Sequence, residues 1–208
     1  MPLLRKLDKA FYDRKDVVAV ARALLGKIIV THFGGWFTSC RIVETEAYAG
    51  EIDRASHAYG GRRTARTSVM YGEPGTAYVY LCYGIHQLFN IVTNSEGTPH
   101  AVLIRAGEPL EGVDFMLART GKIHADHSLT RGPGNVAKAL GIFTTHTGRS
   151  LDSEDFFIAE DGFKVKKSSI ISTPRIGVDY AGAHAQLLYR FVVKESPYIS
   201  GRKLKISN

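Results

Sequence analysis

Two glutamates and a tyrosine alternate along the segment from Arg41 to Tyr48. Side chains of a β-strand point alternately to opposite faces, so Ile42, Glu44, Glu46 and Tyr48 would share one face. A solvated face explains these carboxylates without any function. A covered face would require partners for them, which is typical of a site where a carboxylate activates water or stabilises positive charge. Both interpretations remain open from this segment alone.

The dipeptide Tyr83-Gly84 separates two strand-like runs rich in apolar and aromatic residues. This pattern predicts a β-hairpin over residues 76–93 with Tyr83 at or near its tip, where a large ring has little core to enter. On a basic protein such a ring is suited to act as a wedge between stacked DNA bases. An ordinary surface tyrosine in a hairpin would have the same sequence.

The basic residues form further candidates. Arg62, Arg63 and Arg66 lie with paired glycines in a polar loop over residues 49–70, which could follow a phosphate backbone or simply be solvated. Arg105 ends an apolar strand, so it is expected to be partly buried and paired with an acid or a phosphate. Lys138 lies in a short helix that opens with Gly-Pro-Gly, and amides at a helix start can hold a phosphate.

Other chemistries have weaker support. His124, Asp126 and His127 place three potential metal ligands within four residues, but no second cluster has metal-ligand spacing, so no metal site is expected. Walker, GxGxxG and GxSxG motifs are absent, which argues against a nucleotide-cofactor enzyme and a serine hydrolase.

The composition fits a soluble, nucleic-acid-binding protein. The 208 residues include 27 basic and 20 acidic side chains, giving a net charge of +7, which favours a polyanionic partner. The two cysteines, Cys40 and Cys82, indicate no disulfide scaffold. The N-terminus, Met1–Lys6, is not followed by a long apolar segment, and no stretch approaches a membrane span of about 20 apolar residues. We therefore expect a soluble intracellular protein.

The elements that position these residues are mostly strands. Strands are expected at 27–33, 36–48, 101–106, 156–159, 163–166, 170–178 and 187–193, with the hairpin at 76–93 and helices at 16–26, 111–120 and 132–140. Strand pairs with short loops and few helices predict an α+β fold. We expect one compact domain over residues 1–208, built on a mostly antiparallel curved sheet with a protruding hairpin.

Taken together, the chain resembles the alkyladenine DNA glycosylase family, the mammalian-type 3-methyladenine DNA glycosylases. The resemblance runs from the N-terminal helix to about Pro197 and is specific because the motifs occur jointly and in order. The matching segments are 41–48, His57 with 60–62, 74–80, Tyr83-Gly84, Asn90, 103–106, 108–112, Gly132-Pro133 and 175–178.

This resemblance implies a monofunctional glycosylase that extrudes damaged purines, with 3-methyladenine, 7-methylguanine, hypoxanthine and ethenoadenine as candidate lesions, and that needs no cofactor. It implies Glu46 as the general base, Arg105 as the residue that helps hold the nucleotide phosphate and the water, and Tyr83 as the intercalating wedge. The implied base pocket comprises Tyr48, His57, Tyr80 and Asn90, with Asn90 excluding normal guanine. Contacts to the DNA backbone are expected from Arg62, Arg66, His86 and Lys138.

The expected partner is double-stranded DNA with damaged purines, bound by a monomer. The polar segment 85–87 after the tip departs from the vertebrate pattern, so the range of lesions stays open. Two alternatives remain, namely a DNA-binding protein without catalysis and a metal-dependent hydrolase using His124, Asp126 and His127.

Overall fold

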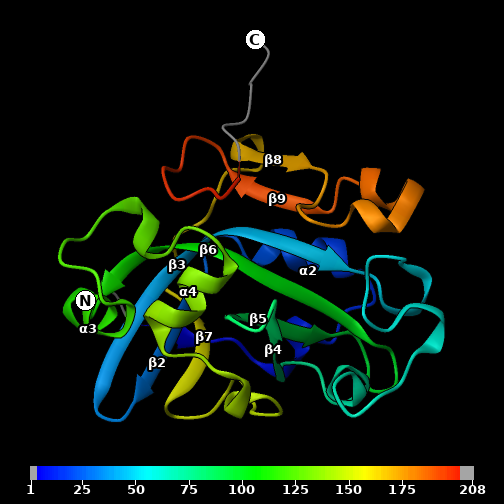
Figure 1. Ribbon diagram of the computed structural model, residues 1–208, viewed down its shortest axis with the longest axis horizontal. Coiled ribbons are helices and arrows are strands. Elements are labelled where there is room, and N and C mark those ends of the chain that lie inside the picture. Colours follow the sequence, from blue (N-terminus) through cyan, green and yellow to red (C-terminus); the bar gives the residue numbers. More distant parts are fainter. Residues whose placement is uncertain (1–3, 202–208) are drawn as a thin grey trace.

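One antiparallel sheet organises the computed structural model, which describes residues 4–201 (Figure 1). Its strands are β1 (Arg5–Lys6), β2 (Ile28–Phe33), β3 (Trp36–Tyr48), β4 (Ala77–Cys82), β5 (His86–Thr93), β6 (His100–Glu111), β7 (Phe156–Glu160), β8 (Ile170–Thr173) and β9 (Arg190–Val193). They run in the order β1-β7-β2-β3-β6-β5-β4, while β9 pairs with β3 and β8 pairs with β9. The expected α+β fold on a mostly antiparallel sheet is confirmed.

Four α-helices are present among the described residues, and short 3₁₀ turns fill much of the remaining loops. They are α1 (Lys9–Tyr12), α2 (Val17–Leu24), α3 (Val113–Thr120) and α4 (Pro133–Leu140). The side chain of Asp16 caps α2 by accepting a hydrogen bond from the Ala19 N–H, and Pro133 occupies the first turn of α4. The main apolar cluster joins α2 and α4 to the central strands.

The central strand β3 has different neighbours along its length. Its first half lies between β2 and β6, and the segment Glu44–Glu46 lies between β6 and β9. A backbone flanked on both sides in this way exposes no edge. The side chains of Glu44 and Glu46 have no exposed surface, so their face of the sheet is covered, which answers the question left by the sequence.

A bulge at Val43 changes which residues of β3 share a face. Ile42 pairs with Gly107 and Glu44 pairs with Ala106, so Val43 is an extra residue in the ladder. Ile42 consequently belongs to the main apolar cluster together with Ala47. The expectation that Ile42 shares the face of the glutamates is therefore wrong.

Three other strand predictions need correction. Residues 163–166 are irregular, and the half-exposed Phe163 ring packs 4.4 Å from the Arg41 guanidinium instead of joining the sheet. The strand expected over 170–178 ends at Thr173, before Pro174, which cannot donate a ladder hydrogen bond. In contrast, β6 is twice as long as expected because it follows the 13-residue β3.

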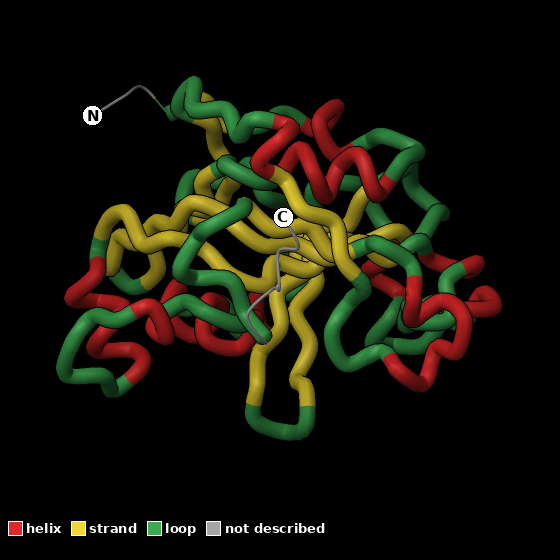
Figure 2. The backbone as a smooth tube through the Cα atoms, turned by 90° about the horizontal axis from the view of Figure 1, so that it is seen from above, coloured by secondary structure: helices red, strands yellow, loops and turns green. Residues whose placement is uncertain are grey.

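The β4–β5 hairpin projects from the body of the molecule (Figure 2). The Ile85 N–H donates to the Cys82 carbonyl, and Tyr83 and Gly84 have φ values of 51° and 72°. Two positive φ values in succession are typical of a turn whose twist matches that of a hairpin. The predicted hairpin and the position of Tyr83 at its tip are confirmed.

Between residues 4 and 201, no helix is long and apolar enough to cross a membrane. The expectation about the chain start concerns in part residues 1–3, which lie outside the described range.

Candidate active site and the hairpin beside it

All six buried charged side chains among residues 4–201 gather around the second half of β3. They are the carboxylates of Glu44, Glu46 and Asp53 and the guanidinium groups of Arg105, Arg175 and Arg190. The three negative and three positive charges balance, as they must where water is excluded, because an unpaired buried charge is very costly. A balanced buried cluster of this kind marks the most polar part of the interior.

Glu46 has no exposed surface, and two hydrogen bonds and one ion pair hold its carboxylate. Its Oε1 accepts the Ile176 backbone N–H at 2.8 Å. Its Oε2 accepts the Tyr48 hydroxyl at 2.8 Å and lies 3.3 Å from a terminal nitrogen of Arg105. Burial, and next the charge of Glu46, raise the pKa of Tyr48, so this hydroxyl keeps its proton and donates it.

A second bulge directs Arg105 toward the glutamates. Glu44 pairs with Ala106 and Thr45 pairs with Ile104, so Arg105 is the extra residue on β6. Its Nε donates to Glu44 Oε1 at 3.0 Å, and its other end reaches Glu46. Sequence alternation alone could not show that one arginine bridges both acids.

The register of the sheet places the pocket beside Glu46. Across the strands, Glu46 lies opposite Leu103, Leu103 opposite Asn90, and Asn90 opposite Tyr78. Leu103, Asn90 and Tyr78 line a cavity of about 440 Å³, together with Tyr48 and Arg105. Glu46 itself lies beneath the lining, covered by the residues that donate to it.

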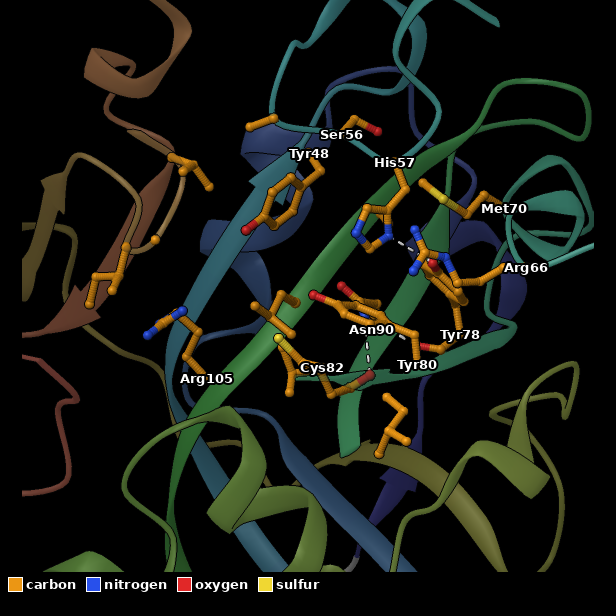
Figure 3. Close-up of a pocket in the computed structure, with 18 of the residues that line it drawn as sticks. Tyr48, Ser56, His57, Arg66, Met70, Tyr78, Tyr80, Cys82, Asn90 and Arg105 are labelled. Atoms are coloured by element: carbon orange, nitrogen blue, oxygen red, sulfur yellow. Dashed lines mark hydrogen bonds between the residues drawn. The ribbon is translucent and has the colours of Figure 1, made fainter. Parts of the chain in front are cut away.

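Aromatic side chains form the wall of this cavity (Figure 3). The Tyr78 and Tyr80 rings lie 5.6 Å apart, and the His57 ring meets Tyr80 edge-on at 4.6 Å. The Asn90 amide nitrogen donates to the carbonyls of Tyr78 and Leu88, which fixes its side chain. The pocket can therefore enclose a flat ring between rigid aromatic faces.

His57 is held in the neutral form. Burial, followed by the positive charges of Arg66 and Arg62, lowers its pKa to about 4. Its Nδ1 shares a 2.8 Å hydrogen bond with the Tyr78 hydroxyl. A neutral imidazole does not repel a positively charged guest.

An ion pair behind Tyr48 was not predicted. Arg175 binds the Asp53 carboxylate through both terminal nitrogens and donates to the Ala47 carbonyl, while its Cζ lies 4.8 Å from the Tyr48 ring centroid. This pairing fixes the loop that presents Ile176 N–H to Glu46. The motif 175–178 was noticed in the sequence, but nothing there indicated Asp53 as its partner.

At the hairpin tip, Tyr83 is 90% exposed and Ile85 is 73% exposed. Tyr83 nevertheless borders the same pocket as His57 and Asn90. The molecule therefore has an exposed aromatic side chain at the hairpin tip and, beside it, a pocket lined by aromatic side chains.

The structure places the four expected DNA-backbone residues differently. Arg66 lines the pocket with its guanidinium 6.0 Å from the Tyr80 ring, and Arg62 is exposed in the adjoining loop. His86, near the tip, lies close to Gly134 at the start of α4. Lys138 instead donates to the Thr120 carbonyl at the end of α3 and does not line the pocket.

The His124–His127 segment is not arranged as a metal site. Asp126 caps a 3₁₀ turn by accepting from the Ser128 N–H, and the His127 ring packs edge-on against Tyr198. Within residues 4–201, no three His, Cys, Asp or Glu side chains come together in a way that could hold a metal ion.

Comparison with known proteins shows the family to which this chain belongs. The family model for methylpurine-DNA glycosylase matches residues 10–197. The chain belongs to the methylpurine-DNA glycosylase family. Relatives named "Putative 3-methyladenine DNA glycosylase" include proteins of Desulfitobacterium hafniense, 43% identical over 95% of this chain and 99% of the relative, and of Methanocella arvoryzae, 47% identical over 94% and 96%. A protein of the same name from Chlamydia abortus is 45% identical over 90% of this chain and 97% of its own.

Membership of this family indicates a DNA glycosylase. The family that the sequence motifs predicted is confirmed. The matched range includes Glu46, Arg105, the pocket and the hairpin, but it ends before Ser200. Ser200 also binds Arg105 and was not indicated by the sequence motifs.

Proposed function

We propose that this protein is a monofunctional DNA glycosylase that starts base excision repair. It flips damaged purines out of duplex DNA and hydrolyses the N-glycosidic bond with water activated by Glu46. The observation that carries this proposal is the buried Glu46 carboxylate, held by Tyr48, Arg105 and Ile176 directly beneath an aromatic pocket.

The chemistry requires a fixed negative charge. Breaking the bond between base and deoxyribose builds positive charge on the sugar, which a nearby carboxylate stabilises while also accepting a proton from water. Each carboxylate oxygen has about two lone-pair sites, and Oε1 of Glu46 accepts the Ile176 N–H, so its second site would accept a hydrogen bond from water. Arg105, which lines the pocket, would help hold that water and the phosphate of the flipped nucleotide.

The pocket suits electron-poor purines. Tyr48 and Tyr80 would stack on the base, and an N-alkylated purine is a cation that aromatic faces attract by about 0.5–2 kcal/mol per favourable contact. The neutral His57 would hydrogen-bond to the base edge. Asn90, fixed by two carbonyls, would disfavour the exocyclic amine of normal guanine. We propose 3-methyladenine, 7-methylguanine, hypoxanthine and ethenoadenine as candidate lesions.

The hairpin and the basic surface would engage the duplex. Tyr83 would fill the gap left by the flipped nucleotide, which offsets part of a flipping cost of a few kcal/mol. Arg62, Arg66, His86 and Lys138 would contact the DNA backbone, in keeping with the net charge of +7. We propose that one domain acts as a monomer, because one flipped base needs only one pocket.

Hydrolysis should be the only reaction. No lysine lines the pocket among the described residues, so no amine is placed to form a Schiff base with the sugar. We expect no covalent adduct when borohydride is added to the protein with a lesion duplex or an abasic duplex. An adduct seen on a denaturing gel would contradict the hydrolytic mechanism.

The deciding experiment compares wild type with Glu46→Gln by single-turnover base release. The substrates are a duplex with one hypoxanthine and an alkylated duplex, and Glu154→Gln, a change at a 99% exposed glutamate, is the control. We expect Glu46→Gln to lose about 10²- to 10⁴-fold in rate with duplex binding retained, and the control to match wild type. Binding without release by wild type would favour a non-catalytic DNA-binding protein.

A further inference from the structure

The C-terminal segment reaches the buried carboxylates of Glu44 and Glu46 beneath the pocket, which we call the floor of the candidate active site. Ser200, which is buried, donates its backbone N–H to Glu44 Oε2 at 2.6 Å and its hydroxyl to Glu44 Oε1 at 2.9 Å. The Ser200 hydroxyl oxygen in turn accepts a terminal N–H of Arg105 at 3.1 Å. A closed ring of hydrogen bonds therefore joins Ser200, Glu44 and Arg105.

These hydrogen bonds decide which nitrogen of Arg105 faces Glu46. Its Nε is bound to Glu44 and one terminal nitrogen to Ser200, so the other terminal nitrogen is left to face Glu46 at 3.3 Å. A guanidinium is planar, so fixing two of its nitrogens fixes the direction of the third. Without the Ser200 hydroxyl, the Nε–Glu44 bond would be the one hydrogen bond left among these to orient Arg105 beside its ion pair with Glu46.

A second arginine neutralises Glu44. The Nε of Arg190 donates to Glu44 Oε1 at 2.6 Å, and a terminal nitrogen of Arg190 donates to the Ser200 carbonyl at 2.7 Å. Because Arg190 already balances the charge of Glu44, the charge of Arg105 is available to Glu46. Ser200 thus lies between the two guanidinium groups and contacts both.

The next residue braces another donor to Glu46. Gly201 has a φ of 80°, and a Cβ placed on it would lie 2.8 Å from Ile176 Cδ1. Gly201 therefore packs closely against the residue whose backbone N–H binds Glu46 Oε1. Two of the three residues that contact the Glu46 carboxylate, Arg105 and Ile176, are in this way contacted by the pair Ser200-Gly201, which lies beyond the range matched by the family model.

We propose that Ser200-Gly201 is a positioning element for the reaction, which orients Arg105 and Ile176 toward the Glu46 carboxylate. Ser200 does not line the pocket, and it would act through Arg105. The proposal rests on the proposed glycosylase function, in which Glu46 activates water. It predicts that loss of the Ser200 hydroxyl slows the chemical step and leaves the binding of lesion DNA unchanged.

The test uses Ser200→Ala, with Ser200→Thr as the conservative variant and Ser196→Ala as the control in the same segment. Single-turnover release from alkylated or hypoxanthine-containing duplex, whichever wild type cleaves, should fall at least about 10-fold for Ser200→Ala. The dissociation constant for lesion duplex should stay within about twofold of wild type, since only the chemical step is affected. Ser200→Thr, which keeps the hydroxyl, should recover most of the rate.

A double-variant cycle separates positioning from general loss of stability. Ser200→Ala should slow release much less in an Arg105→Gln background, because the group it orients is already absent. Equal effects in both backgrounds would mean that Ser200 contributes only to folding and would overturn the proposal. So would a wild-type rate for Ser200→Ala.

Amide hydrogen exchange at Ile176 tests the other contact without relying on activity. Gly201→Ala should accelerate exchange of the Ile176 N–H at least about 10-fold relative to wild type, since the added Cβ and the strain of alanine at this positive φ would displace Ile176 from Glu46. Unchanged exchange would overturn the Gly201 contact even if wild type released no base. Absence of base release by wild type would instead contradict the proposed function.

Discussion

The floor of the pocket and the tip of the hairpin differ in almost every physical property. At the floor, Glu44 and Glu46 have no exposed surface and are surrounded by arginine side chains and backbone donors. At the tip, Tyr83 is 90% exposed and adopts a φ of 51°, which is uncommon for a residue other than glycine and is strained for a bulky one. The floor is therefore constrained by the whole fold, whereas the tip is constrained only by its own turn.

This contrast separates two kinds of functional residue. A buried carboxylate in a balanced cluster cannot be removed without leaving its partners unpaired, so its functional and structural roles are mixed. A strained, exposed tyrosine contributes little to folding, so its presence points to a role other than stabilising the folded chain. Substitutions should therefore lower the free energy of unfolding most at the floor, less at the pocket wall and least at the tip.

The largest loss of stability is expected for Glu44→Ala. The change leaves Arg105, Arg190 and the Ser200 N–H without their shared acceptor. We expect the free energy of unfolding in urea to fall by about 3–5 kcal/mol. Glu44→Gln, which keeps an acceptor oxygen, should lose clearly less, and equal stability of Glu44→Ala and wild type would show that the floor is not a folding constraint.

An intermediate effect is expected at the pocket wall, where burial lowers the pKa of His57 to about 4. The unfolded chain has the ordinary histidine value of about 6.5, so between these values the unfolded state binds more protons. Stability should therefore fall as the pH falls from about 6.5 to about 4, by about 1–3 kcal/mol from this residue.

The measurement is urea unfolding of wild type and His57→Asn across this pH range. Burial also lowers the pKa values of His100 and His146, so only the difference between the two proteins reports on His57. Parallel pH curves would show that His57 is not held neutral by the fold.

The smallest change in stability is expected for Tyr83→Gly, because glycine adopts the observed positive φ without strain. The free energy of unfolding should stay the same or rise by up to about 1 kcal/mol. Affinity for lesion duplex should nevertheless fall by about 5- to 150-fold, since one stacked base contact contributes about 1–3 kcal/mol.

Ile85→Ala, at the same tip, is the matched control and should bind lesion duplex nearly as wild type does. If Tyr83→Gly instead lowered the free energy of unfolding and left affinity for lesion duplex unchanged, Tyr83 would have a structural role and no role in DNA binding.

Local patterns were sufficient for several parts of the molecule. The helix beginning after Asp16, the β2–β3 pair and the hairpin tip at Tyr83 all follow from caps, alternation and turn residues within short segments. The shared face of Glu44, Glu46 and Tyr48 was also correctly anticipated, while Ile42 was not. These features depend on interactions between residues close in sequence, which a single sequence displays directly.

The sequence by itself thus determined the family, the main strands and the types of residue available for chemistry. Only the tertiary structure decided how the charges pair. The bulges at Val43 and Arg105 and the contact of Glu44 with Arg105, 61 residues away, come from strand register, whereas the contact of Glu44 with Ser200, 156 residues away, comes from the return of the C-terminal segment to the sheet. Register and buried ion pairs are set by the requirement that distant segments jointly satisfy every covered polar group, and no local pattern encodes that requirement.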